Sequence, residues 1–428
     1  MPMIQIIENP GKLYWQGLLA RPSDHAGNLD TAVRKILEDV KINGDQAVAS
    51  YSLQFDQVSI SDRLVLQNEF DEAENELDEN LKGAIRQSKK NIETFHSKQI
   101  IPEPEVEILT GIRCWRKSVA IEKIGLYIPG GTAPLFSTLL MLGVPASLAG
   151  CEEIIVCSPP QKNGNLHPAI LYTAKLLGFR KVFKVGGVQA IAAMAYGTAT
   201  IPSVYKIFGP GNQYVTHAKK LIQQEGIAID MPAGPSELAV YADDTAIPDF
   251  VAADLLSQCE HGGDSQVILV TPSRLFAEKV NESLESHIEK LPRKSVALQS
   301  LRNSKIFLIP DPGVAMDLLN EYAPEHLMLA CRDPQKLALS VRNAGSVFLG
   351  NYAPESAGDY ASGTNHTLPT NGFARAYSGV SVDSFVKKIS FQELTQEGLR
   401  SIASTVVEMA MAEGLQGHAD SVSIRLKA

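Results

Sequence analysis

The strongest constraint on the fold is a repeated alternation of short apolar runs with longer helical stretches. Between residues 117 and 235, the apolar runs IGLYI, EEIIVCS and KVFKVGG are each followed by a stretch with helical spacing of its apolar residues. Strands and helices that alternate in this way form parallel sheets, because the chain crosses over through a helix before each new parallel strand. The alternation resumes at ELAVYAD and SQVILVTP. The sequence therefore predicts an α/β fold with two Rossmann-like parallel-sheet modules and a boundary near residue 235.

Helical and loop-rich segments accompany these modules. Residues 30–100 have helical apolar spacing, including one long charged amphipathic stretch. The passage from residue 351 to residue 372 is rich in Gly, Pro, Ser, Asn and Thr, and a long loop in a compact protein is usually functional or disordered. The stretch LTQEGLRSIASTVVEMAMAEG then has helical character. We expect small N-terminal and C-terminal helical segments outside the two modules.

Charge and cysteine content exclude several classes of protein. The 39 Lys and Arg residues are outnumbered by 48 Asp and Glu residues, whereas a protein that binds nucleic-acid phosphates needs a basic face. The five cysteines are widely spaced and contain no Cys-x-x-Cys pair, which fits neither a disulfide framework nor a cysteine zinc site. The sequence lacks a signal-peptide pattern and the roughly 18 uninterrupted apolar residues of a membrane span. We expect a soluble cytoplasmic protein that binds neither nucleic acid nor membrane.

Three glycine-rich turns indicate a nucleotide site. Residues 125–134, 184–190 and 207–213 each follow an apolar run and precede a helix. Glycine lets backbone N–H groups approach a ligand closely, and a helix N-terminus favours an anion such as a pyrophosphate. None of the turns contains the GxGxxG fingerprint of dinucleotide-binding folds, and any βα loop favours glycine. The prediction depends on three such turns falling in one module, at strand ends where α/β folds bind ligands.

The stretch DLLSQCEHGG offers two candidate metal ligands. Gln258 and His261 are three residues apart, which places them on one face of a helix. Zinc usually takes about four ligands. The obvious further donors are Asp359 in ESAGDYASG and His418 in AEGLQGHAD, both expected outside regular structure. Spacing alone does not bring these four residues together, and His261 could equally be a helix cap or a packing residue.

The stretch EYAPEHLML places two proton carriers side by side in an otherwise apolar segment. His326 titrates near neutrality and can take a proton from a hydroxyl group. Glu325 in an apolar site would have a raised pKa and could handle a second proton or activate water. The alternative is a surface glutamate followed by a capping histidine.

The other histidines and Cys259 have simpler interpretations. Cys259 could act as a nucleophile in aldehyde oxidation, but its setting is also that of a small buried helix residue. Charged or polar surroundings lead us to expect the remaining histidines at the surface: His25, His96, His167, His217, His287 and His366.

Taken together, these stretches resemble the histidinol dehydrogenase family along nearly the whole chain. The densest motifs are, in order, GLYIPGGTAPLFST, GGVQAIAAMAYGT, KIFGPGN, IDMPAGPSE, DLLSQCEHG, YAPEHL, AGDYASGTNHTLPT and AEGLQGHA. So many long motifs in one order make the resemblance specific. It implies a zinc- and NAD-dependent oxidation of L-histidinol through L-histidinal to L-histidine, the last two steps of histidine biosynthesis.

The resemblance also implies roles for individual residues. His326 would be the general base, and Glu325 would activate the attacking water. One Zn²⁺ per subunit would be held by four side chains: Gln258, His261, Asp359 and His418. Substrate contacts would come from His326 and these zinc ligands, together with Ser236 and Glu413. NAD⁺ contacts would come from the glycine-rich turns and their helices: Tyr127, Gln189 and Asn212.

The family is a homodimer in which the C-terminal segment reaches the partner's active site. By this resemblance, Glu413 and His418 would act in the partner's site rather than in their own. The chain would divide into an N-terminal arm (1–22), a catalytic α/β domain in two parts (23–126 and 236–380), a Rossmann-like NAD-associated domain (127–235) and a C-terminal segment (381–428).

Three alternatives stay open from the residues. A zinc hydrolase could use Glu325 to activate a metal-bound water, although the glycine-rich turns weigh against it. A relative of the same fold could oxidise another alcohol, such as a sulfonated diol, although Ser236, Glu413 and His418 favour histidinol. A non-catalytic binding protein would have no reason to fill every matched metal, base and substrate position.

Overall fold

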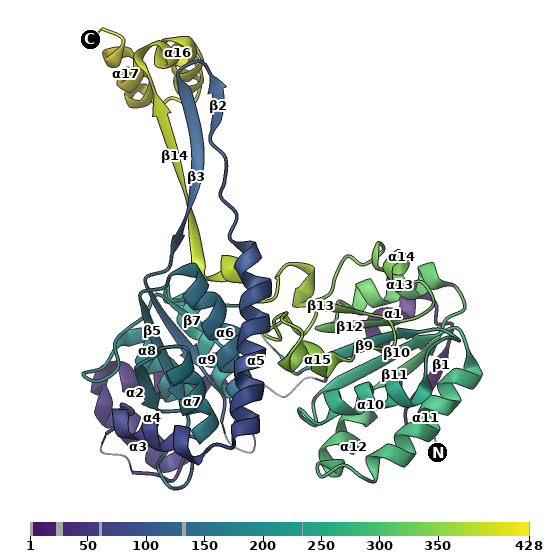
Figure 1. The fold of residues 1–428 in the computed structure, drawn as a ribbon. Helices are drawn as coiled ribbons and strands as arrows, with labels where there is room; N and C mark the ends of the chain where they lie inside the picture. The colour runs from purple at the N-terminus through teal and green to yellow at the C-terminus, as the bar shows by residue number, and fades with distance from the viewer. Residues whose placement is uncertain (1–2, 23–28, 60–61, 131–133, 233, 428) are drawn as a thin grey trace.

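Two α/β lobes lie side by side, and a long arm projects away from them (Figure 1). The computed structural model describes residues 3–22, 29–59, 62–130, 134–232 and 234–427. His25 and residues 131–133 of the first glycine-rich turn lie outside these ranges. Among the helices in the described part of the chain, none combines the length and the apolar character needed to cross a membrane.

The first lobe is built on a five-stranded parallel sheet in the order β6-β5-β4-β7-β8. Its strands are β4 (Lys123–Tyr127), β5 (Glu153–Ser158), β6 (Lys181–Lys184), β7 (Lys206–Phe208) and β8 (Ala228–Ile229). Its helices are α2 (Leu29–Asn43), α3 (Asp45–Phe55), α4 (Gln67–Glu76), α5 (Glu79–His96), α6 (Phe136–Ala149), α7 (Pro168–Leu176), α8 (Gly187–Tyr196) and α9 (Gln213–Gln224). The strand order reverses at β4, and α/β folds bind ligands at the carboxyl ends of strands beside such a reversal.

The second lobe contains a six-stranded parallel sheet in the order β1-β11-β10-β9-β12-β13. Its strands are β1 (Gln5–Glu8), β9 (Glu237–Ala242), β10 (Gln266–Thr271), β11 (Lys305–Leu308), β12 (His326–Ala330) and β13 (Ser346–Leu349). Its helices are α1 (Lys12–Leu18), α10 (Pro248–Cys259), α11 (Arg274–Ile288), α12 (Lys294–Arg302), α13 (Pro312–Tyr322), α14 (Pro334–Ala338) and α15 (Glu355–Tyr360). The two predicted parallel-sheet modules are therefore confirmed. Strands β9, β10 and β12 are buried along their whole length, which explains their nearly continuous apolar sequences.

The packing of residues 29–96 differs from the expected division of the chain. Val33 and Tyr51 of α2 and α3 share one hydrophobic cluster with Ile155 of β5. Helix α5 packs on α6 in the same lobe. These helices therefore belong with the five-stranded sheet, whereas the expected division joined 23–126 to 236–380. An amphipathic helix shows that one face is covered, but its sequence does not specify which sheet covers it.

The arm is an antiparallel sheet that the alternation of strands and helices did not reveal. It consists of β2 (Val106–Leu109), β3 (Ile112–Ala120) and β14 (Val386–Leu394) in the order β14-β3-β2. Short 3₁₀ helices lie at Ser97–Gln99, Phe373–Arg375 and Val382–Phe385. The expected C-terminal helices, α16 (Gln396–Ala412) and α17 (Gln416–Arg425), lie at the tip of the arm.

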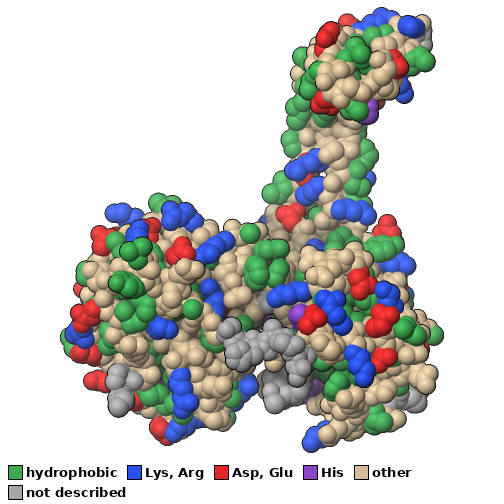
Figure 2. Space-filling view, turned by 180° about the vertical axis from the view of Figure 1, so that it is seen from behind, with side chains coloured by type: hydrophobic (Ala, Val, Ile, Leu, Met, Phe, Trp, Pro, Cys, Tyr) green, Lys and Arg blue, Asp and Glu red, His purple; other side chains and the backbone are tan. Residues whose placement is uncertain are grey.

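The arm carries apolar side chains that nothing in the described chain covers. Figure 2 shows hydrophobic side chains along the arm and around its tip. The exposed ones are Val106, Ile108, Leu109, Ile389, Phe391, Met409, Met411, Leu415 and Ile424. Contiguous exposed apolar surface of this kind usually marks a contact with another protein chain.

A partly buried carboxylate, that of Asp56, lies at the end of α3. The Asp56 Oδ2 atom is buried and accepts no hydrogen bond from the described residues. Burial raises the pKa of Asp56 to about 6. The folded protein therefore holds a proton on Asp56 that the unfolded chain releases above about pH 4. It follows that the free energy of unfolding falls as the pH rises from about 4 to about 6, and stays lowered above that range.

We predict that Asp56→Asn stabilises the protein at neutral pH. The amide has no charge to desolvate, so the free energy of unfolding should rise by on the order of 1 kcal/mol at about pH 7.5, after allowance for solvent screening of a partly exposed group. At about pH 4 the gain should vanish, because both the carboxyl and the amide are then neutral. Urea unfolding of both proteins at the two pH values measures the difference, and an equal gain at both would contradict this explanation.

Candidate active site

A cleft of about 850 Å³ brings residues from both lobes together. The five-stranded lobe contributes Tyr127 and Asn212. The six-stranded lobe and its loops contribute Ser236, Gln258, His261, Glu325, His326 and Asp359. Most of the residues predicted from separate motifs therefore face one cavity, which sits at the carboxyl end of β4 and beside the start of β12.

Three predicted residues lie elsewhere. Gln189 of α8 is fully buried, and neither atom of its amide has a hydrogen-bond partner among the described residues. It lies close to Tyr127, because the Tyr127 hydroxyl accepts a 3.1 Å hydrogen bond from the N–H of Gly187, two residues before Gln189. Glu413 and His418 are exposed at the tip of the arm, outside the lining of the cleft.

The turn after β7 gives the cleft a wall of bare backbone. Gly209 has φ +122°, and a Cβ there would overlap the carbonyl of Tyr127, so only glycine lets this turn pack against β4. The buried ion pair of Lys219 and Asp230 holds this turn in place. The Lys219 ammonium donates to Gly209 O at 2.8 Å, and the Asp230 carboxylate accepts from Gly209 N at 2.8 Å. Asn212 caps α9 by accepting from two backbone N–H groups at 3.1 Å. The N-terminus of α9 thus opens on the cleft, where it can hold a phosphate.

Glu325 and His326 are held by one backbone segment. The carboxylate of Glu325 accepts a hydrogen bond from Glu237 N at 2.9 Å. His326 Nδ1 donates to Glu237 O at 3.2 Å, since a carbonyl oxygen can only accept. This contact places the proton on Nδ1 and leaves Nε2 with a free lone pair. Nε2 lies 3.9 Å from a carboxylate oxygen of Glu355 and 3.9 Å from one of Asp359.

Burial shifts the proton affinities of both residues toward their neutral forms. It raises the pKa of Glu325 well above its usual range, and the nearby carboxylates of Glu237, Asp359 and Glu355 raise it further. Burial lowers the pKa of His326 to about 3, so its imidazole is neutral at physiological pH. The site therefore contains a neutral histidine that can accept a proton and a carboxyl group poised to exchange one.

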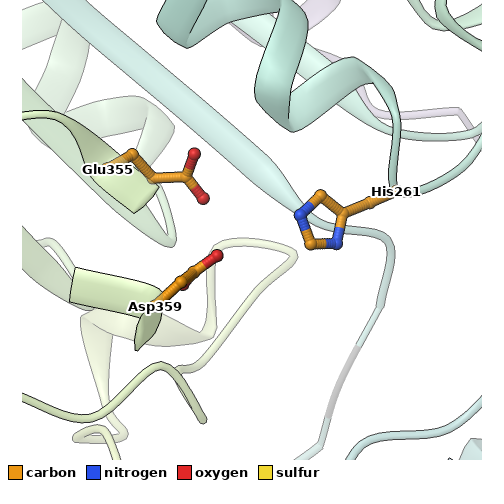
Figure 3. Close-up of side chains that lie close together, drawn as sticks. All are labelled: His261, Glu355 and Asp359. Atoms are coloured by element: carbon orange, nitrogen blue, oxygen red, sulfur yellow. The ribbon is translucent and has the colours of Figure 1, made fainter. Parts of the chain in front are cut away.

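Oxygen and nitrogen donors for a metal ion converge beside this pair. His261, Glu355 and Asp359 each offer a ligand atom, and these atoms lie within 4.8 Å of one another (Figure 3). Gln258 is fully buried with both amide atoms unpartnered among the described residues. Burial raises the pKa values of Glu355 and Asp359, and the Asp359 charge raises that of Glu355 further, a penalty that a bound cation would offset. These residues fit a zinc ion, which takes nitrogen and oxygen ligands in proteins.

Two residues of this site were not identified from the sequence. Glu355 begins α15 and accepts a 2.9 Å hydrogen bond from the Ser257 hydroxyl, while its Oε1 atom has no hydrogen-bond partner among the described residues. Its spacing of four from Asp359 would have indicated a shared helix face, but the composition of residues 351–372 suggested a loop. His366 Nδ1 donates to Asp359 O at 3.0 Å, and its Nε2 lies 3.3 Å from the Thr138 hydroxyl of the other lobe.

Several expectations for single residues were wrong. Asp359 lies in α15 and His418 in α17, not outside regular structure. His366 lines the cleft and His96 is buried, although both were expected at the surface. Loop-like or polar neighbours in sequence do not reveal burial that arises from contacts between distant segments.

Cys259 does not have the surroundings of a nucleophile. All five cysteines lie in the described residues and none forms a disulfide. Cys259 is fully buried, and burial raises the pKa of its thiol to about 12. The thiolate needed for attack on an aldehyde is therefore absent at neutral pH, and the interpretation of Cys259 as a packing residue is favoured.

We predict that a chelator lowers the thermal unfolding midpoint by roughly 5 °C and that added Zn²⁺ restores it, because a ligand bound only by the folded state stabilises it. The difference should shrink below about pH 5, where the ligands become protonated. Scanning calorimetry with and without chelator measures it. Asp359→Ala should abolish the response, whereas Asp249→Ala, which removes an exposed carboxylate from α10, should preserve it. An unchanged response in Asp359→Ala would contradict the assignment.

Members of one protein family match the chain over almost its entire length. A family model described as histidinol dehydrogenase matches residues 19–426. The histidinol dehydrogenase of Bacteroides thetaiotaomicron is 55% identical over 424 residues, which cover 99% of each chain. That of Escherichia coli strain K12 is 48% identical over 414 residues, 96% of this chain and 94% of its own. The crystal structure of histidinol dehydrogenase from Elizabethkingia anophelis has a TM-score of 0.98 at 50% identity and covers 100% of this chain and 99% of that chain.

Proposed function

Since the chain belongs to the histidinol dehydrogenase family, we propose that it oxidises L-histidinol through L-histidinal to L-histidine, the last two steps of histidine biosynthesis, with Zn²⁺ and NAD⁺. The observation that carries the proposal is the convergence on one cleft of a poised acid–base pair, a set of metal donors and a wall of glycine-rich backbone. A hydrolase would have no use for the third of these features.

The proposal assigns the metal and the cofactor to opposite sides of the cleft. Gln258, His261 and Asp359 would hold Zn²⁺ from this chain. Tyr127 and Asn212 would contact NAD⁺, with Gln189 behind Tyr127. When bound, Zn²⁺ supplies a Lewis acid that orients the nitrogen atoms of the substrate, and NAD⁺ supplies the acceptor for one hydride in each oxidation.

His326 and Glu325 would move the protons of the two oxidations. Each oxidation removes a hydride from carbon and a proton from a hydroxyl group, first in the alcohol and then in the hydrated aldehyde. The free Nε2 of His326 is oriented to take the hydroxyl proton. Between the oxidations a water molecule must add to the aldehyde, and Glu325 in its ionised form, which a cation bound nearby would favour, would take the proton of that water. The burial of both residues supports this role, because it excludes competing water.

The positions of Ser236, Glu413 and His418 support a shared site in a homodimer. Ser236 lines the cleft and would contact the substrate directly. Glu413 and His418 lie at the arm tip, away from the cleft of their own chain. We assign them to the partner's cleft, where Glu413 would contact the substrate's cationic groups and His418 would complete the zinc ligands. The exposed apolar residues of the arm supply surface for this contact.

We predict that the zinc-loaded protein forms about two NADH per L-histidinol consumed, with L-histidine as the product. His326→Asn should lower kcat by about 10²- to 10⁴-fold, since it removes the general base. His287→Asn, a partly exposed histidine outside the cleft, serves as the matched control and should be fully active. Absorbance at the NADH band and chromatography of the products measure these outcomes. One NADH per L-histidinol, with L-histidinal accumulating, would contradict the role of Glu325. No NADH at all would contradict the dehydrogenase activity.

We predict that two inactive variants regain activity when their subunits are exchanged. In a hybrid dimer of one His326→Asn subunit and one His418→Asn subunit, both substitutions fall in the same active site. The other active site of that dimer is intact. Half of a random mixture is hybrid, so activity should recover to about one quarter of the wild-type level. The matched control mixes His326→Asn with Asp359→Asn, whose defects fall in different sites of the hybrid, and should regain nothing. Lack of recovery in the first mixture would contradict a site shared between subunits.

A further inference from the structure

Glu237, the first residue of β9, contacts both proton carriers through its main chain. Its N–H donates to the Glu325 carboxylate at 2.9 Å, and its carbonyl accepts from His326 Nδ1 at 3.2 Å. The second contact is the one that sets the tautomer of His326. A small displacement of this backbone segment would therefore disturb both groups at once.

The side chain of Glu237 is tied down by the N-terminal arm. Its carboxylate is almost fully buried and accepts hydrogen bonds from Arg21 Nε, from Arg21 Nη2 at 2.8 Å and from Asn371 N at 2.7 Å. Arg21 Nη2 also donates to Tyr322 O at 2.7 Å, and the guanidinium lies over the Tyr322 ring at 4.2 Å. Tyr322 ends α13, three residues before Glu325.

The bidentate pair joins four of the chain segments around the acid–base residues. Arg21 follows α1, Glu237 starts β9, Tyr322 precedes β12 and Asn371 ends the loop that begins after α15. Burial raises the pKa of Glu237, and the Arg21 guanidinium opposes this change. Without Arg21 the buried carboxylate would lose its main partner, so it would either take up a proton or move toward water. Movement of this side chain displaces the backbone that orients Glu325 and His326.

We propose that Arg21 and Glu237 are positioning residues of this enzyme, which hold the main chain at β9 so that His326 keeps its Nδ1–H tautomer and Glu325 keeps its place. Resting on the proposed function, this inference adds a role for the N-terminal arm in catalysis. Neither residue needs to touch the reacting atoms. With the Glu237 carbonyl out of place, the imidazole proton is free to sit on Nε2, and the base then has no lone pair facing the cleft.

The test is kinetic comparison of Arg21→Met, Arg21→Lys and a matched control. Arg63→Met removes the cation of another largely buried Arg–carboxylate pair, with Asp45, which lies in the five-stranded lobe outside the cleft. Urea unfolding midpoints show how far each variant is destabilised, and zinc content per subunit shows whether the metal site remains assembled.

We expect Arg21→Met to lower kcat by about 10- to 100-fold, with the KM values for L-histidinol and NAD⁺ changed by less than about 3-fold and with zinc content unchanged. Arg21→Lys should recover part of kcat, because lysine keeps the positive charge but cannot form the bidentate hydrogen bonds of the guanidinium. Arg63→Met should be destabilised without loss of kcat. If Arg21→Met fails to fold, the kcat of Arg21→Lys against Arg63→Met decides the question alone.

Two results would overturn the inference. One is a kcat for the folded Arg21 variants equal to that of Arg63→Met, which would leave the pair a purely structural role. The other is a loss confined to KM, which would make Arg21 a binding residue. Failure of the proposed function is distinguishable from both, because the wild-type protein would then form no NADH from L-histidinol.

Discussion

Four carboxylates are buried close together around Glu325, and desolvation makes each of them dependent on a particular partner. The Glu237 carboxylate accepts hydrogen bonds from the Arg21 guanidinium, and the Glu325 carboxylate accepts one from a backbone N–H. Glu355 accepts from one hydroxyl, its other oxygen has no partner in the described part of the chain, and Asp359 lies beside it. Like charges this close in a buried site repel unless protons or cations intervene. The desolvation that raises the pKa values of these carboxyl groups therefore favours the binding of a divalent ion. It also prepares Glu325 to exchange a proton.

The metal-donor segment is attached to both lobes, so the site depends on how the lobes pack together. Asp359 lies on α15, beside the six-stranded sheet, but the residues that follow it bond to the other lobe. Asn91 of α5 donates to Ala361 O at 2.7 Å, and Asn365 donates to Met141 O of α6 at 2.6 Å. His366 links Asp359 O with Thr138 across the cleft. The candidate metal donors and the glycine-rich wall are thereby fixed relative to each other, as the proposed hydride transfer requires.

Much of the architecture could be predicted because buried parallel strands have a distinctive sequence. Strands such as QVILVT of β10 are covered on both faces and stay largely apolar, so the presence of such strands and their parallel direction can be derived from the pattern. The arm could not, because β3 and β14 pair in a ribbon largely open to solvent and carry mixed side chains. The lobe to which α2–α5 belong could not be predicted either. An amphipathic sequence shows that one face of a helix is buried, but it does not show which sheet buries that face.

For the site, the sequence by itself determined the chemistry available: a histidine beside a glutamate, Gln258 and His261 on one helix face, and glycines where backbone must approach a ligand. Only the tertiary structure decided which groups meet. Glu355 and His366 became part of the site because α15 and its loop fold across both lobes, and Arg21 because β9, α13 and the N-terminal arm converge. Hydrogen bonds act over about 3 Å, whereas Arg21 lies 216 residues from Glu237 and His366 lies 228 residues from Thr138, so sequence spacing carries no record of these contacts.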